Sequence, residues 1–120
     1  MKVKKWLLGL VTFTAMVVIC AVCAGAETYG DFEYSVRDDG TVEITDYNGN
    51  AKTVDIPETI DGKSATRIGD SAFEWCSNIE SIAIPDSVTS IGRRAFGDCA
   101  NLTNITIPNS VIEIGWHAFY

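Results

Sequence analysis

The chain has 120 residues, nine of them basic and sixteen acidic, and its formal net charge is −7. Three of the basic residues lie within the first five positions, so the part after Ala26 has six basic and sixteen acidic residues, a net charge of −10. Binding to nucleic acids or anionic membranes depends on Lys and Arg side chains that neutralise phosphates. This composition excludes both kinds of partner. The 94 residues after Ala26 are enough for one small hydrophobic core and not for two.

The N-terminal segment 1–26 has the pattern of a secretory signal peptide. Lysines at positions 2, 4 and 5 precede an apolar stretch from Trp6 to Val22, and Ala24-Gly25-Ala26 provides the small residues that signal peptidase accepts. We therefore expect export to the cell surface or medium, with cleavage after Ala26. The apolar stretch is near the lower length limit for crossing a bilayer, so an uncleaved anchor is the alternative.

The next segment, 27–50, shows the pattern of a β-hairpin. Apolar residues alternate with polar ones over 32–36 and again over 42–44, on either side of a turn-like Asp38-Asp39-Gly40. Tyr47-Asn48-Gly49-Asn50 then resembles a link to the following segment. We predict that the hairpin caps the apolar end of the structure that follows it.

The segment 51–120 is an internal repeat with a period of about 23 residues, a length typical of solenoid repeats. When 84–97 is aligned with 107–120, eight of fourteen positions are identical, including both Ile-Pro pairs, whereas average composition gives roughly one match by chance. An earlier Ile56-Pro57 precedes Ile84-Pro85 by more than one period. The first unit therefore carries an insertion around 59–63, in which Asp61-Gly62 predicts a turn.

The content of each repeat predicts a solenoid. Leu-x-x-Leu-x-Leu patterns at 51–56, 79–84 and 102–107 suit a strand with one buried face, ended by proline. The Gly-x-x-Ala-Phe-x-x-Cys spacing suits one short helical turn. We predict a leucine-rich-repeat solenoid of about three coils, each a β-strand plus a short helical turn, stacked at roughly 4.8 Å. The last coil is incomplete, so we expect either that the solenoid continues in a longer protein or that something covers this end.

The repeated pattern Ile-Pro-x-Ser-Val-x-x-Ile-Gly-x-x-Ala-Phe-x-x-Cys-x-Asn-Leu-x-x-Ile-x-Ile-Pro, over about 51–120, resembles the repeat of the bacterial surface-antigen (BspA-like) leucine-rich-repeat family. The resemblance implies a secreted or surface-displayed protein, and some members of the family are implicated in adhesion to host proteins or other cells. The shared residues build the coil, so no functional residue is carried over from the family.

Few residues in the repeats suggest chemistry. Cys76 and Cys99 occupy one column of adjacent coils, where we expect small buried hydrophobic side chains, with a disulfide as the alternative. His117 is the only histidine and shares a column with Ser71 and Arg94, which is typical of a solvated position. We therefore predict no catalytic, cofactor or metal site, and do not expect an enzyme.

A binding surface is predicted from the repeat geometry instead. The outward side chains of the stacked strands are Thr53, Asp55, Glu80, Ser81, Ala83, Thr103, Asn104 and Thr106. Trp75 and Trp116 are expected to pack into the core or the coil edge, although an exposed Trp116 beside Arg93 would make a stronger contact. The leading hypothesis is an adhesion or binding module for a protein or other extracellular macromolecule. The alternative is a passive spacer, or the N-terminal part of a longer surface protein with a possible enzymatic domain downstream.

Overall fold

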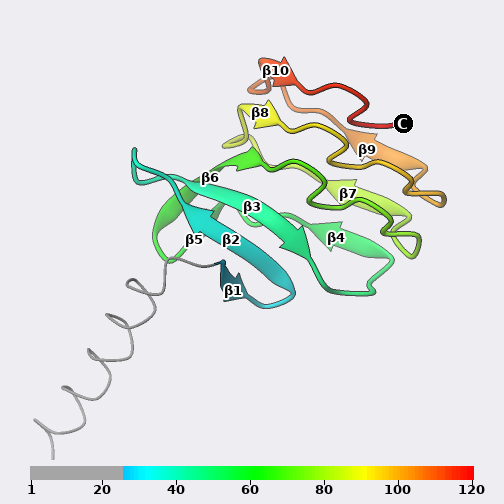
Figure 1. Cartoon of the computed structure of the whole chain (residues 1–120), viewed down its shortest axis with the longest axis horizontal. Helices are drawn as coiled ribbons and strands as arrows, with labels where there is room; N and C mark the ends of the chain where they lie inside the picture. Colours follow the sequence, from blue (N-terminus) through cyan, green and yellow to red (C-terminus); the bar gives the residue numbers. More distant parts are fainter. Residues whose placement is uncertain (1–25) are drawn as a thin grey trace, which may run out of the picture.

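The structure, a computed structural model, describes residues 26–120. The predicted signal peptide, apart from Ala26, lies outside the described residues. The described chain winds into a β-solenoid of three stacked coils behind an N-terminal hairpin (Figure 1). Within this part of the chain, no helix is long and apolar enough to cross a membrane.

Two sheets run along the solenoid. The larger has the order β1-β2-β3-β6-β8-β10, with β5 added beside β6, and the smaller has the order β4-β7-β9. The first part of the chain forms β1 (Glu27–Tyr29), β2 (Phe32–Val36), β3 (Val42–Tyr47), β4 (Thr53–Asp55) and β5 (Thr59–Ile60). The rest forms β6 (Lys63–Ile68), β7 (Ser81–Ala83), β8 (Ser90–Ile91), β9 (Asn104–Thr106) and β10 (Glu113–Ile114). All pairings between coils are parallel and in register.

The N-terminal segment joins the solenoid as its first layer. Strands β2 and β3 pair in antiparallel fashion, and β3 then pairs in parallel with β6 of the first coil. Tyr47, interpreted above as part of a link, instead ends β3 and is 7% exposed. The hairpin therefore supplies both backbone partners and a buried aromatic side chain to the first coil.

The insertion at 59–63 forms a second, smaller hairpin. Strand β5 pairs with the start of β6 in antiparallel register. The two residues between them, Asp61 and Gly62, have positive φ angles of 51° and 72°. Two consecutive residues with positive φ are the signature of a tight hairpin turn, and Asp-Gly favours it. The turn predicted here is thus present.

The predicted content of a coil needs two corrections. Each coil has a second short strand, β6, β8 or β10, whereas we predicted one strand per coil. The expected short helical turn is wrong, because residues 26–120 contain no helix. The Gly-x-x-Ala-Phe segment is instead a run of tight turns.

Hydrogen bonding explains why these turns are not helical. From Ser71 to Trp75, alternate N–H groups donate to the next coil, as in Phe73 N to Ala95 O at 2.7 Å. The intervening N–H groups donate three positions back, as in Glu74 N to Ser71 O at 3.1 Å. In an α-helix, each N–H beyond the first turn would donate to the carbonyl four positions back in the same segment. The backbone here divides its donors between its own coil and the next one.

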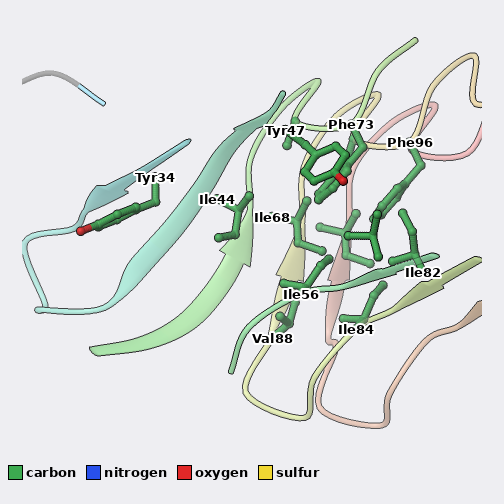
Figure 2. Close-up of a cluster of buried hydrophobic side chains, with 14 of the residues drawn as sticks. Tyr34, Ile44, Tyr47, Ile56, Ile68, Phe73, Ile82, Ile84, Val88 and Phe96 are labelled. Atoms are coloured by element: carbon green, nitrogen blue, oxygen red, sulfur yellow. The ribbon is translucent and has the colours of Figure 1, made fainter. Parts of the chain in front are cut away.

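The core is a set of ladders that run through all the layers. The rings of Tyr47, Phe73, Phe96 and Phe119 stack in that order, with centroid separations of 5.4, 5.2 and 5.4 Å. Figure 2 shows the rings of Tyr47, Phe73 and Phe96 beside aliphatic side chains of the core such as Ile44 and Ile68. Because each coil is too thin to enclose a core, burial of its apolar side chains depends on the neighbouring coil.

Close approach of the coils requires glycine at one corner. A Cβ atom placed on Gly92 would lie 2.6 Å from the backbone N of Asp70 and 2.6 Å from the carbonyl carbon of Gly69. Real Cβ atoms do not approach backbone atoms so closely. The glycine in the repeated Ile-Gly pair therefore allows two coils to touch at this corner.

Replacement of Phe73 by Ala is expected to destabilise the fold strongly. Phe73 is 0% exposed and lies between Tyr47 and Phe96 in the aromatic stack. Loss of the ring should lower the free energy of unfolding by about 3–5 kcal/mol, as measured by urea denaturation. Trp116→Ala is the matched control, because that ring is 68% exposed. Equal losses in the two variants would contradict a core centred on the aromatic stack.

Replacement of Trp75 by Asn is expected to stabilise the fold. Trp75 has a φ angle of +65°, a left-handed conformation that bulky side chains adopt at a free-energy cost and Asn adopts more readily. Asp98 holds the equivalent place in the next coil with a φ of +54°. We expect Trp75→Asn to raise the free energy of unfolding by about 0.5–1 kcal/mol. A lower value than that of the wild type would mean that the indole contributes packing that outweighs the strain.

Candidate binding surface

The predicted strand face lies on the sheet formed by β4, β7 and β9. Its side chains form two rows across the coils, with Thr53 beside Ser81 and Ser81 beside Asn104 in the first row. The second row consists of Asp55, Ala83 and Thr106. Five of these six residues are exposed and Ser81 is half-buried. The structure therefore brings the predicted strand residues together in one ordered polar array.

Glu80 and Thr103 directly precede β7 and β9, and so lie beside the first row of this array. The Thr103 hydroxyl donates to the Glu80 carbonyl at 3.4 Å, and the Glu80 carboxylate lies 3.5 Å from Lys52 Nζ. None of the exposed large apolar side chains in residues 26–120 lies on β4, β7 or β9. The face can offer hydrogen bonds and the carboxylates of Asp55 and Glu80, but no aromatic anchor.

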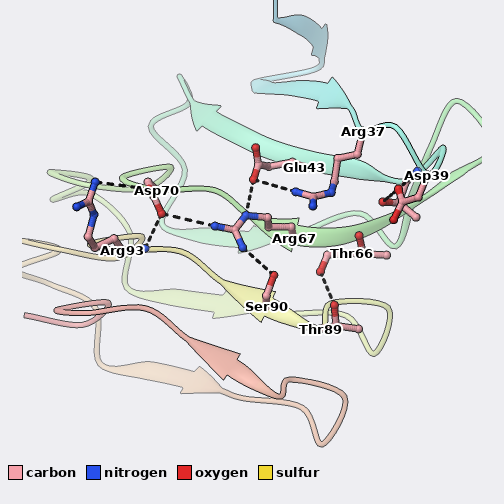
Figure 3. A network of polar contacts seen from close by, with 10 residues as sticks. Arg37, Asp39, Glu43, Thr66, Arg67, Asp70, Thr89, Ser90 and Arg93 are labelled. Atoms are coloured by element: carbon pink, nitrogen blue, oxygen red, sulfur yellow. Dashed lines mark hydrogen bonds and ion pairs between the residues drawn. The ribbon is translucent and has the colours of Figure 1, made fainter.

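A second surface, on the larger sheet, is organised by ion pairs (Figure 3). Arg67 lies between Glu43 and Asp70, with its Nη2 atom 3.7 Å from Asp70 Oδ1, and it also donates to Ser90 Oγ at 3.2 Å. Asp70 Oδ1 accepts the backbone N–H of Arg93 at 2.7 Å. These contacts join the hairpin to two successive coils. The positive charges of Arg67 and Arg93 are balanced by the carboxylates of Glu43 and Asp70. This column of ion pairs therefore contributes chiefly to stacking of the coils.

Arg93 and Trp116 lie together at the end of that column, as the alternative hypothesis proposed. They line one shallow groove of about 540 Å³ with Asp70 and Glu113. The expected burial of the two tryptophans is wrong, since Trp75 is 69% and Trp116 68% exposed. The groove that contains Arg93 and Trp116 includes no residue of the strand face. The predicted surface residues therefore form two separate areas.

A groove around Trp75 was not foreseen from the sequence. It has a volume of about 650 Å³, and its polar lining comes from Ser77, Asp98, Thr103 and Tyr120 around the exposed indole of Trp75. Thr103 is the member of the strand face that borders it. Trp75 shares its column with Asp98, and this outward column position was the signal that could have revealed its exposure.

Charged groups lie directly beside this groove. Arg94 contacts the carboxylates of Glu74 at 2.6 Å and Asp98 at 3.1 Å. Hydrogen bonds from the Ser71 side chain and then from Arg94 hold the pKa of Glu74 below its ordinary value. Two carboxylates thus share one guanidinium, and the group keeps a net negative charge at neutral pH.

Cys76 and Cys99 lie against the core, partly buried, as free thiols. The Cys99 thiol donates to the carbonyl of Phe73 at 3.0 Å. The same carbonyl accepts the backbone N–H of Cys76 at 3.2 Å. Burial raises the pKa of both thiols, to about 11 for Cys76. Both side chains therefore act as small core residues at neutral pH.

His117 and Asn101 are two further polar side chains of the coils with a defined packing or hydrogen-bond partner. His117 is partly buried, with its ring between those of Trp116 and Tyr120, rather than fully solvated as its column suggested. The Asn101 side chain donates to the Ser77 carbonyl at 2.6 Å. In residues 26–120 no group of three or more His, Cys, Asp or Glu side chains is placed to hold a metal ion.

Comparisons with known proteins agree with this architecture. A family model described as a BspA-type leucine-rich repeat region, in six copies, matches residues 66–120. A leucine-rich-repeat protein of Bacteroides capillosus is 33% identical, with a TM-score of 0.67 over 74% of this chain and 70% of that one. A leucine-rich-repeat protein of T. pallidum is 32% identical, with a TM-score of 0.75 over 80% of this chain and 45% of that one. A leucine-rich cell-surface protein of Faecalibacterium prausnitzii is 34% identical, with a TM-score of 0.73 over 79% of this chain. No curated protein sequence matches.

The stacked coils and their repeated columns define a leucine-rich-repeat solenoid. The chain belongs to the BspA-type leucine-rich-repeat family. It spans 45% of the T. pallidum protein and 27% of the Faecalibacterium prausnitzii protein. Those relatives therefore contain much that has no counterpart here.

The Cys76 thiol is expected to resist alkylation. Burial, then the charges of Cys99 and Asp46, raises its pKa to about 11, so it stays protonated at neutral pH. The iodoacetamide rate at Cys76, followed by peptide-resolved mass spectrometry, should rise with a midpoint near pH 11. In denaturant the midpoint should return toward 9.0, the ordinary value. Since the folded thiol holds its proton to higher pH than the unfolded one, this contribution to stability is lost between these two values. A midpoint at 9.0 in the folded protein would contradict burial of the thiol.

Proposed function

We propose that this chain is an exported leucine-rich-repeat module that binds a protein or other macromolecule outside the cell, and thereby serves in adhesion. Support for binding comes from the in-register polar array on β4, β7 and β9, which is the observation that carries the proposal. Support for export comes from the signal-peptide pattern and from a relative described as a cell-surface protein. The proposed role is binding, not catalysis.

The shape of the array favours a macromolecular ligand. Side chains in neighbouring coils lie at the regular spacing of parallel strands, so the array extends along the solenoid instead of surrounding a point. A small molecule is usually enclosed in a pocket with apolar walls. A partner with its own extended surface could use the hydrogen-bonding groups of all three coils together.

A second candidate function is that of a spacer. The chain spans only 27% of the cell-surface protein of Faecalibacterium prausnitzii. In a protein of such length, these coils could hold a binding or enzymatic domain away from the cell surface. In that case the strand face would be solvated and unused.

Adhesion through the strand face predicts a loss of function in Ala83→Arg. Ala83 is exposed and lies between Asp55 and Thr106 on the central strand, so an arginine there would cover the array. Beads that carry the full chain are incubated with cultured epithelial cells and with bacterial cells, and bound cells are counted. We expect Ala83→Arg to reduce the number bound by about tenfold.

Ile112→Arg is the matched control, because Ile112 is 84% exposed and precedes β10 of the other sheet. It should bind as the wild type does. If both variants bound as many cells as the wild type does, the strand face would not be the binding surface, and the spacer function would be favoured. Retention of the full chain in the cytoplasm of its native host would contradict the proposal as a whole.

A further inference from the structure

Trp75 is an unfavourable residue for the position it occupies. Its φ angle of +65° is rare for a bulky side chain, and its indole is 69% exposed. The backbone there is held by the inter-coil hydrogen bond from Trp75 N to Gly97 O at 2.9 Å. The indole therefore adds strain to the backbone while burying little apolar surface. A side chain that serves the fold so poorly suggests a contact outside the chain.

The surroundings of Trp75 combine an aromatic ring with carboxylates. The groove it lines has mainly apolar walls, which include Phe96, Leu102, Ile105 and Phe119; Asp98 is its one carboxylate, and Thr103 and Tyr120 add hydroxyl groups. Glu74 precedes Trp75 in the chain and shares Arg94 with Asp98. Asp46, at the end of β3, is close enough to raise the pKa of the Cys76 thiol next to Trp75. The edge around Trp75 thus keeps an excess of negative charge.

The charge of the described chain points to the same kind of ligand. Each of the six Lys and Arg side chains in residues 26–120 already forms an ion pair with a carboxylate of the chain. A cation from a partner would meet both the ring and the surplus carboxylates.

We propose that the groove around Trp75 binds a cationic side chain, Arg or Lys, of a partner protein. The indole face would take the cation, while Asp98 would accept its N–H groups and Thr103 would join this contact to the strand face. The inference rests on the proposed binding function and adds the chemistry of the partner. A guanidinium fits better than an ammonium, because it is planar and can stack on the indole while it donates to a carboxylate.

The test uses the full chain and a defined peptide, acetyl-Gly-Arg-Gly-Arg-Gly-amide. The matched probe carries citrulline in place of each arginine, which keeps the shape and removes the charge. Binding is followed by calorimetry and by the NMR shift of the Trp75 indole N–H, assigned from the Trp75→Asn variant. We expect the arginine peptide to shift this signal, with binding that weakens as salt is added. The citrulline peptide should bind at least about tenfold more weakly.

Two variants separate this contact from general attraction to an acidic protein. Trp75→Asn should weaken binding of the arginine peptide about tenfold, whereas Tyr29→Ala, which removes an exposed aromatic ring on β1 outside both grooves, should leave it unchanged. Equal binding by Trp75→Asn and wild type would overturn the proposal, as would failure of the wild type to bind the arginine peptide. Equal binding of the citrulline peptide would point to a neutral ligand, such as a glycan, and would overturn it too.

The outcome is independent of the adhesion assay. Loss of adhesion in Ala83→Arg together with unchanged peptide binding in Trp75→Asn would leave the binding module intact and remove only the cationic contact. If Trp75→Asn lost peptide binding while Ala83→Arg had no effect on adhesion, the cationic contact would stand and the proposed adhesion through the strand face would be removed.

Discussion

Stacking of equivalent side chains between coils is the constraint on which the rest of this structure depends. A single coil cannot enclose its own isoleucines and phenylalanines, so each layer is buried only by contact with the next. The aromatic stack shows this directly, since Phe73 is covered by Tyr47 on one side and Phe96 on the other. The hairpin can begin the series because Tyr47 provides a ring where a coil would provide phenylalanine. Glycine at one corner and hydrogen bonds shared between coils then follow from the need for close, in-register contact.

The solenoid could be predicted from the sequence because side chains that stack between coils must recur at the repeat period. Columns such as Ile68 and Ile91 recur at the repeat period and are buried side by side. The helical turn was wrongly predicted because Ala, Phe and Cys at that spacing would also face one side of a helix. What decides between the two is whether the N–H of Phe73 has an acceptor in the next coil, and Ala95 provides one. Periodicity within one coil carries no record of that tertiary partner.

The candidate surface was predictable to a lesser degree. Alternation in a short strand fixes which side chains point outward, so the array on β4, β7 and β9 could be named residue by residue. The exposure of Trp75 was missed, because large aromatic side chains are more often buried and its left-handed backbone appears only in the structure; the column that it shares with Asp98 was the one signal for it. His117 is the opposite case, because it is more buried than its column suggested. Its column suggested solvent, but the neighbouring rings of Trp116 and Tyr120 cover it. In neither case does the column alone determine how the side chain is packed.

The division between inward and outward columns also determines where specificity can arise. An inward substitution affects the coils on both sides, because each buried side chain packs against its equivalents. An outward column accepts different types of residue in successive coils, as Asp70, Arg93 and Trp116 in one column show. Chemistry that distinguishes this chain from a generic stack of coils must therefore lie in outward positions that depart from the repeat. Trp75 departs most clearly, because its column partner Asp98 suits the left-handed backbone and Trp75 does not. A residue retained against the preference of its own backbone is better explained by a contact beyond the fold than by the fold itself.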